Sequence, residues 1–290
     1  METRRLDSLP GLTPLYGKAV LGLLPGTGGD SLPDLQIEAG GVQVDPEHLS
    51  EYCRVCGFTM RDALPPTYPH VLAFPLAMAL MTDGSFPFPL MGLVHIANRI
   101  EQQTPIPMTT PLTLRVRAED LRDHPKGRQL DVVGEAEHDG TLLWTGRSTY
   151  LRRGGGSGEG RSEGGGDPLE GAATAAVWKV PGDIGRRYAA VSGDRNPIHL
   201  HGLAAKPFGF PGAIAHGMWM KARCLAALDG DLPETHASEV EFRAPLRIPG
   251  RARFLLRSGD PAAGANRRWA FGLESFDREH RHLSGTVAPF

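Results

Sequence analysis

An internal repeat is the feature of this 290-residue sequence that most restricts its fold. Three segments of the first half recur in the second half in the same order: 65–79 over 211–225, 100–117 over 240–257, and 134–146 over 273–285. The second match needs no gap and places Glu101 on Glu241 and Pro105 on Pro245. A chain of this length is long enough for two domains. The repeat therefore predicts two copies of one fold.

Each copy is expected to combine one apolar helix with several strands. The helices are expected over 71–81 and 214–228, and the second should end at a cap formed by Asp229 and Gly230. Alternating hydrophobicity predicts strands at 112–121, 129–138, 251–258 and 268–276. A helix that is apolar on nearly all sides must be covered, and a curved antiparallel sheet is the available cover. The expected fold class is α+β.

A glycine-rich segment separates the two copies. Residues 152–171 replace apolar periodicity with glycine, serine and charge, a composition typical of a flexible linker. The predicted domains are therefore residues 1–151 and residues 172–290. A phosphate-binding loop is not expected in the linker, because the pattern G-x-x-x-x-G-K-[ST] is absent.

Composition and charge argue against several kinds of partner. The formal net charge is −2 and basic residues alternate with acidic ones, so nucleic acid is not an expected partner. No apolar run is long enough to span a bilayer, and no convincing signal-peptide cleavage site follows the N-terminal segment. Three cysteines cannot form a disulfide framework and suit a reducing compartment. We expect a cytoplasmic protein that does not bind membranes.

A polar motif occurs only in the second copy. Residues 193–199 read G-D-R-N-P-I-H, in which glycine, asparagine and proline favour an irregular loop of defined shape. Such a loop can hold Asp194 and His199 so that both contact one water molecule, and an imidazole can exchange a proton near neutral pH. The first copy offers Asp62 and His70 but no comparable arrangement. The motif suits the addition or removal of water.

Two other interpretations of the motif remain open at this level. Asp194 or Asn196 could simply cap the backbone of a surface turn. Asp194, His199 and His201 could also bind a metal ion, because two histidines at H-x-H spacing can chelate, although no further ligand is evident nearby. If it is not a ligand, His201 is expected to be exposed or to lie beside the site.

The wider segment from Tyr188 to Ala205 resembles the signature of the (R)-specific enoyl-CoA hydratases, also called MaoC-like dehydratases. Residues 208–222, F-G-F-P-G-A-I-A-H-G-M-W-M-K-A, resemble the segment that follows in that family. The duplicated layout is similar to the double hot-dog members of the family, whose N-terminal copy lacks the catalytic pair. The resemblance implies a double hot-dog fold, in which two curved antiparallel sheets each wrap round a central helix.

The resemblance also implies roles for single residues. In the family, the residues that match Asp194 and His199 activate a water, which adds to C3 of a trans-2-enoyl thioester; in reverse, a (3R)-hydroxyacyl thioester loses water. Gly217 matches the oxyanion-hole position, and a backbone N–H at a helix start is a preorganised donor for negative charge. The supporting residues of the loop are expected to be Ser192, Gly193 and Asn196.

The implied reaction uses water as co-substrate and neither a metal nor a redox cofactor. The expected partner is a thioester of coenzyme A or of acyl carrier protein, and the chain is expected to act as a monomeric pseudo-dimer or as a homodimer. Two other functions stay open: a hot-dog thioesterase and a non-catalytic acyl-CoA or acyl-carrier binding protein. The complete G-D-x-N-P-x-H motif argues against the thioesterase.

Further residues carry less specific expectations. His216 is expected to pack or cap at the helix entry, since an aligned histidine occurs in the copy without the motif. Cys53 and Cys56 form a single C-x-x-C pair, so neither a zinc ribbon nor a redox role is expected. The run 72–93, rich in methionine and phenylalanine, is expected to lie mostly in the core, and the family resemblance implies that it could line a groove for acyl tails.

Overall fold

The computed structural model describes residues 1–21, 31–154, 167–206, 209–259 and 267–290. The first half contains β1 (Glu2–Leu6), α1 (Leu12–Leu21), β2 (Leu35–Val42), α2 (Pro46–Cys56), α3 (Tyr68–Met81), β3 (Leu93–Gln102), β4 (Leu112–His124), β5 (Gly127–His138) and β6 (Thr141–Arg153). The second half contains β7 (Ala173–Val180), α4 (Ile184–Ser192), α5 (Pro197–Leu200), α6 (Gly202–Ala205), α7 (Gly217–Ala226), β8 (His236–Phe242), β9 (Gly250–Ser258), β10 (Trp269–Ser275) and β11 (Arg281–Ala288). The four predicted strands are confirmed as β4, β5, β9 and β10.

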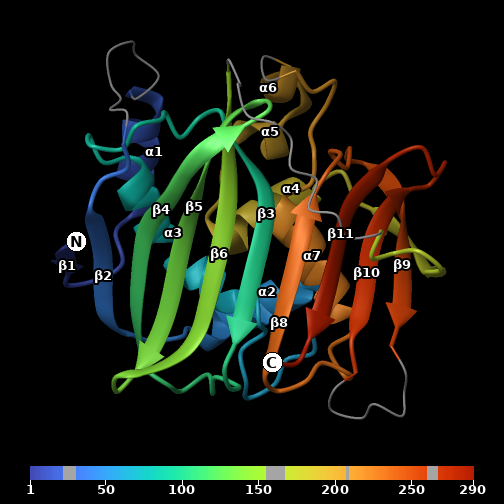
Figure 1. Cartoon of the computed structure of the whole chain (residues 1–290), viewed down its shortest axis with the longest axis horizontal. Coiled ribbons are helices and arrows are strands. Elements are labelled where there is room, and N and C mark those ends of the chain that lie inside the picture. Colours follow the sequence, from blue (N-terminus) through green and yellow to red (C-terminus); the bar gives the residue numbers. More distant parts are fainter. Residues whose placement is uncertain (22–30, 155–166, 207–208, 260–266) are drawn as a thin grey trace.

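All eleven strands of the described chain form one sheet in the order β1-β2-β4-β5-β6-β3-β8-β11-β10-β9-β7. From the centre outwards the two halves follow the same plan, β3-β6-β5-β4-β2 and β8-β11-β10-β9-β7, and β1 adds a parallel strand at the outer edge of β2. Figure 1 shows the strands side by side, with α2, α3, α4 and α7 on one face of the sheet. This arrangement confirms the α+β double hot-dog fold.

The two half-sheets join where β3 pairs antiparallel with β8. Arg99 lies opposite Glu239 and forms an ion pair with it. These two residues are equivalent in the repeat, at the same offset that aligns Glu101 with Glu241. Two equivalent residues can face each other only at a two-fold axis. The chain is therefore a pseudo-dimer with its axis at this pair, and its two sheets are continuous.

The central helices α3 and α7 correspond to the two predicted helices, and their apolar residues join a core that extends through both halves. α7 begins later than predicted, because Ile214 is still extended and forms a β-bridge with Arg247. The predicted cap at Asp229 and Gly230 is wrong, since the C-cap residue is Ala227 in right-handed helical conformation. The chain leaves this helix through turns without a left-handed residue at the cap.

One of the three repeat matches is out of register. The Leu64 N–H donates to the Ile106 carbonyl at 2.8 Å, and the Ala215 N–H donates to the Leu246 carbonyl at 2.8 Å. Ile106 and Leu246 are equivalent in the gap-free match, so Leu64 and Ala215 are equivalent as well. The predicted match over 65–79 pairs different residues and is wrong in detail. Apolar helix starts resemble one another, and this similarity permitted the shifted alignment.

Each half also contains a helix that the sequence analysis did not predict. α2 and α4 precede the central helix, and each ends at a glycine in left-handed conformation, Gly57 with φ 85° and Gly193 with φ 76°. Both helices are short and bury one side, and their buried residues recur at helical spacing. This amphipathic signal was present in the sequence and was missed. β1 and α1 precede the repeat, and the described part of the second half has no counterpart to them.

The connection between the halves is described only in part. β6 ends at Arg153 and β7 begins at Ala173, while residues 155–166 of the predicted linker lie outside the described residues. The linker and the domain limits therefore stay predictions. Among the described residues, no helix combines the length and the apolar character needed to cross a bilayer.

Candidate active site

The polar motif begins at the C-terminus of α4. The Gly193 N–H closes the helix by donating to the Ala189 carbonyl at 3.1 Å. The left-handed φ of Gly193 favours glycine, and a Cβ at this position would lie 2.4 Å from Leu12 Cδ1. Conformation and space therefore both require glycine here. The turn directs the next residue, Asp194, away from the helix.

Side chains of the loop hold the loop's own backbone. The Asp194 N–H donates to Ser192 Oγ at 3.2 Å, and Asp194 Oδ1 accepts from the Asn196 N–H at 3.1 Å. Asn196 Oδ1 in turn accepts from the Ile198 N–H at 3.4 Å and caps α5. In this geometry Ser192 and Asn196 shape the loop, and the Asp194 side chain remains 34% exposed.

His199 lies on α5 with its ring buried. Its Nδ1 is 2.8 Å from the Ile214 carbonyl, and because a carbonyl oxygen only accepts, Nδ1 carries the proton. The other nitrogen, Nε2, is then free to accept a proton when the ring is neutral. Burial lowers the pKa of His199, and the negative charge of Asp194 opposes this shift. The neutral ring is therefore the favoured form near neutral pH.

His216 contacts both Asp194 and His199, the predicted pair. Its ring stacks on the His199 ring with centroids 3.7 Å apart, and its Nε2 donates to the Asp194 carbonyl at 2.9 Å. Burial lowers the pKa of His216 well below the ordinary value. Its side chain does not cap α7, so the capping expectation is wrong and the packing expectation is confirmed. The sequence analysis did not predict its contact with Asp194.

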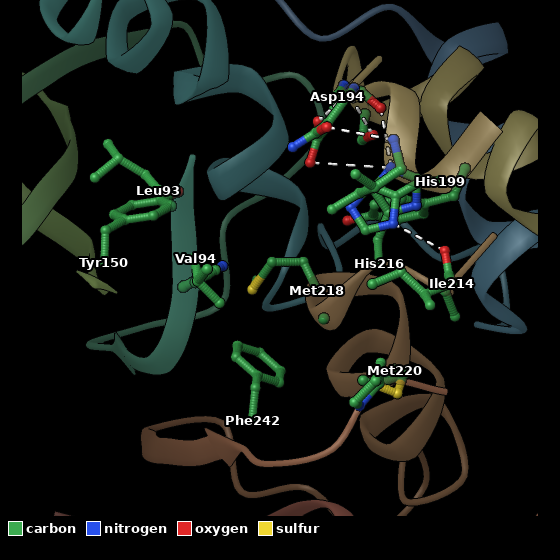
Figure 2. A pocket seen from close by; sticks show the side chains of 18 of the residues that line it. Leu93, Val94, Tyr150, Asp194, His199, Ile214, His216, Met218, Met220 and Phe242 are labelled. Atoms are coloured by element: carbon green, nitrogen blue, oxygen red, sulfur yellow. Dashed lines mark hydrogen bonds and ion pairs between the residues drawn. The ribbon is translucent and has the colours of Figure 1, made fainter. Parts of the chain in front are cut away.

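The structure brings Asp194, His199 and His216 together. Candidate donor atoms of the three side chains lie within 4.8 Å of one another, and Figure 2 shows them gathered at one end of a pocket. Two hydrogen bonds of about 2.8 Å each span up to about 5.6 Å, so one water molecule can contact Asp194 and His199 together. His201 is exposed and not part of this group. The metal-ligand set that includes His201 is therefore wrong.

A cavity of about 280 Å³ opens beside this group and is lined by both halves. Much of its wall is apolar, and the apolar lining includes Phe74, Leu93, Val94, Met218, Met220 and Phe242. Gly217 also lines it, and a Cβ on Gly217 would lie 3.1 Å from the Phe242 ring. The Gly217 N–H is the first amide of α7, a position for which no helix carbonyl is available. Of the run 72–93, Phe74 and Leu93 face the cavity, whereas Leu76 and Leu80 lie fully buried in the core.

The first half also contributes polar side chains that the sequence analysis missed. Tyr150 on β6 and His95 on β3 line the cavity, with ring centroids 4.7 Å apart. Burial lowers the pKa of His95 to about 3 and that of His70, another lining residue, to about 4. The sequence analysis named His70 but gave it no place in the site. No local pattern identifies Tyr150 or His95, because the cavity that they line forms only where the first half meets the second.

The three cysteines are free and buried. Burial raises the pKa of Cys53 to about 11 and raises those of Cys56 and Cys224 further. The thiols therefore stay protonated and are poor nucleophiles and poor metal ligands. This geometry agrees with the expectation that the C-x-x-C pair has no redox role.

Comparison with known proteins gives one family. Residues 173–268 match the family model described as the MaoC like domain. Over 260 residues the chain is 36% identical to 3-hydroxyacyl-thioester dehydratase X of Mycobacterium tuberculosis, covering 89% of this chain and 90% of that protein. It is 31% identical over 239 residues to enoyl-CoA hydratase ChsH3 of the same organism, covering 76% and 78%. The crystal structure of HtdX from M. tuberculosis has a TM-score of 0.76 at 34% identity, covering 88% of this chain and 100% of that chain.

Proposed function

The chain belongs to the family of MaoC-like dehydratases, and we propose that it hydrates trans-2-enoyl thioesters and, in reverse, dehydrates (3R)-hydroxyacyl thioesters. It is a hydro-lyase, in line with relatives named as a 3-hydroxyacyl-thioester dehydratase and an enoyl-CoA hydratase. One observation carries the proposal for the site: Asp194 and His199 lie close enough to share a water at the wall of a largely apolar cavity.

In the hydration direction, we assign proton acceptance to His199 Nε2, with Asp194 orienting the same water. The water oxygen bonds to C3, the π bond between C2 and C3 breaks, and its electron pair moves towards the thioester carbonyl as an enolate. C2 then takes a proton from the Asp194–His199 pair. The elements of water have been added, and both side chains return to their starting state.

The negative charge on the thioester oxygen needs a hydrogen-bond donor in place before the reaction. We assign this role to the Gly217 N–H at the start of α7, where the helix dipole also favours an anion. A side chain at this position would press on the Phe242 ring, so glycine keeps the amide accessible from the cavity. Removing such a donor typically raises the barrier by about 3–4 kcal/mol.

The proposed reaction uses water alone as co-reactant, with no metal or redox cofactor. His199 Nδ1 and His216 Nε2 both donate to backbone carbonyls, so a metal at either nitrogen would have to displace a proton and a hydrogen bond. The acyl group enters as a thioester of coenzyme A or of acyl carrier protein, and the apolar wall suits its hydrocarbon part.

The oligomeric state and the cellular location of the protein are also proposed. One chain already joins two hot-dog halves around one cavity, so we propose that a monomeric pseudo-dimer is sufficient and that a homodimer would repeat the same site. The buried free cysteines fit a reducing compartment, which supports the cytoplasm as the location.

The test is an assay of the purified protein with crotonyl-CoA and longer trans-2-enoyl-CoAs. Loss of enoyl absorbance without release of free thiol is the expected result. Release of thiol would identify a thioesterase instead. Tight binding with neither change, repeated with carrier-protein thioesters, would identify an acyl-thioester binding protein and would overturn the enzymatic proposal.

A further inference from the structure

We propose that Tyr16, on the N-terminal helix α1 of the first half, positions Asp194 in the second half. This inference rests on the proposed function. The Tyr16 hydroxyl donates to the Gly193 carbonyl at 2.8 Å and accepts from the Arg195 N–H at 2.6 Å. These two groups belong to the residues immediately before and after Asp194. A single hydroxyl thus fixes the backbone on both sides of the carboxylate-bearing residue.

The contact belongs to a packed interface between α1 and the loop. Leu12, one helical turn before Tyr16, packs so closely on Gly193 that a Cβ there would lie 2.4 Å from its Cδ1. Leu15 and Ala19 of the same helix are buried, and α1 packs on α3. Burial and the negative charge of Asp194 raise the pKa of Tyr16, so its hydroxyl stays protonated and able to donate.

The backbone of Asp194 is held from several elements, although its side chain is partly exposed. Its N–H donates to Ser192 Oγ, its carbonyl accepts from His216 Nε2, and Tyr16 holds the neighbouring peptide groups. Burial alone does not fix a side chain that is 34% exposed. The direction of the carboxylate therefore depends on the direction of the backbone, which Tyr16 holds through hydrogen bonds from the first half.

The test removes the hydroxyl and keeps the ring. For Tyr16→Phe we expect kcat for crotonyl-CoA hydration to fall by roughly 10- to 100-fold, because small displacements of reacting groups cost up to about 100-fold. KM should stay within about twofold, since Tyr16 does not line the cavity. The matched control is Tyr52→Phe, which removes a buried hydroxyl bonded to Thr67 Oγ1 at 2.7 Å; it should keep the wild-type kcat.

A double-mutant cycle separates positioning from general stability. If Tyr16 acts through Asp194, then Tyr16→Phe combined with Asp194→Asn is no slower than Asp194→Asn alone. Rates are compared below the melting temperature of each variant. A wild-type kcat in Tyr16→Phe, or losses that add in the double variant, would overturn this inference while leaving the proposed function intact. A wild-type protein that hydrates no enoyl thioester would overturn both.

Discussion

The ends of α2 and α4 have the same local structure, but the residues that follow them lie in different surroundings. Both carry the pattern Y-x-x-V-x-G, at residues 52–57 and 188–193, and both end at a left-handed glycine. After the first glycine comes Phe58, which is buried and stacks on the Tyr52 ring with centroids 6.4 Å apart. After the second comes Asp194, which faces the cavity. The turn is common to both halves, and the residue that follows it lies in the core in one half and at the cavity wall in the other.

The histidine of the pair has a different origin from the aspartate. In the first half the chain runs directly from Gly57 to the bridge residue Ala63, whereas in the second half it runs from Gly193 to the bridge residue Ile214. The longer path contains α5 and α6, and His199 lies on α5. The first half therefore has another residue in place of the aspartate and has no segment that could carry the histidine.

The strongest test of this comparison removes the two side chains found only in the second half. Asp194→Asn and His199→Gln should each lower kcat for crotonyl-CoA by roughly 10²- to 10⁴-fold, because general acid–base groups contribute about that much. Circular dichroism and thermal unfolding should match the wild type. The control is Asp62→Asn, which changes the exposed acidic residue of the shorter first-half path and should keep the full rate. A near-wild-type rate in either site variant would show that the pair is not catalytic.

A second test changes the shared glycines. Alanine at Gly193 or Gly57 would need a left-handed conformation that costs about 1–2 kcal/mol. Its Cβ would also lie 2.4 Å from Leu12 Cδ1 or 2.7 Å from Arg223 Nη1. We expect denaturant unfolding to show reduced stability for both variants. Only Gly193→Ala should also lower kcat, by about tenfold, because it displaces Asp194. Equal kcat values in the two variants would mean that the turn does not position the carboxylate.

A smaller effect is expected from pH, because Asp194 acts on the pKa of His199 but not on that of the buried His95. Burial lowers the pKa of His95 in the first half to about 3, whereas in the second half Asp194 opposes the lowering for His199. Only neutral His199 accepts a proton, so kcat/KM for hydration should fall as pH falls through a pKa below the ordinary value of about 6.5. Asp194→Asn removes the opposing charge, so the His199 pKa measured by NMR should fall further. An acid limb centred above pH 6.5, or a raised pKa in the variant, would contradict this assignment.

Features encoded in short segments could be predicted from the sequence, whereas contacts between distant segments could not. The gap-free match between 100–117 and 240–257 identified equivalent strands. The motif G-D-x-N-P-x-H predicted that Asp194 and His199 lie together, and the structure places their candidate donor atoms within 4.8 Å of each other. Both signals lie within short segments. His216 and Tyr16 could not be assigned in this way. They reach Asp194 and its neighbours from 22 and 177 residues away in the chain, through contacts that exist only after α1 and α7 have packed.

The smallest expected effect is that of metal removal. Among the described residues, only the second half brings three side chains of metal-ligating type together. Asp194, His199 and His216 form such a group, yet two of its ring nitrogens already donate to the carbonyls of Ile214 and Asp194. These bonds orient the rings and leave His199 Nε2 for water. Dialysis against EDTA should therefore leave kcat and KM unchanged. Added Zn²⁺ should inhibit, because it competes with a proton for that nitrogen. Activity that is lost on chelation and restored by Zn²⁺ would instead make this group a catalytic metal site.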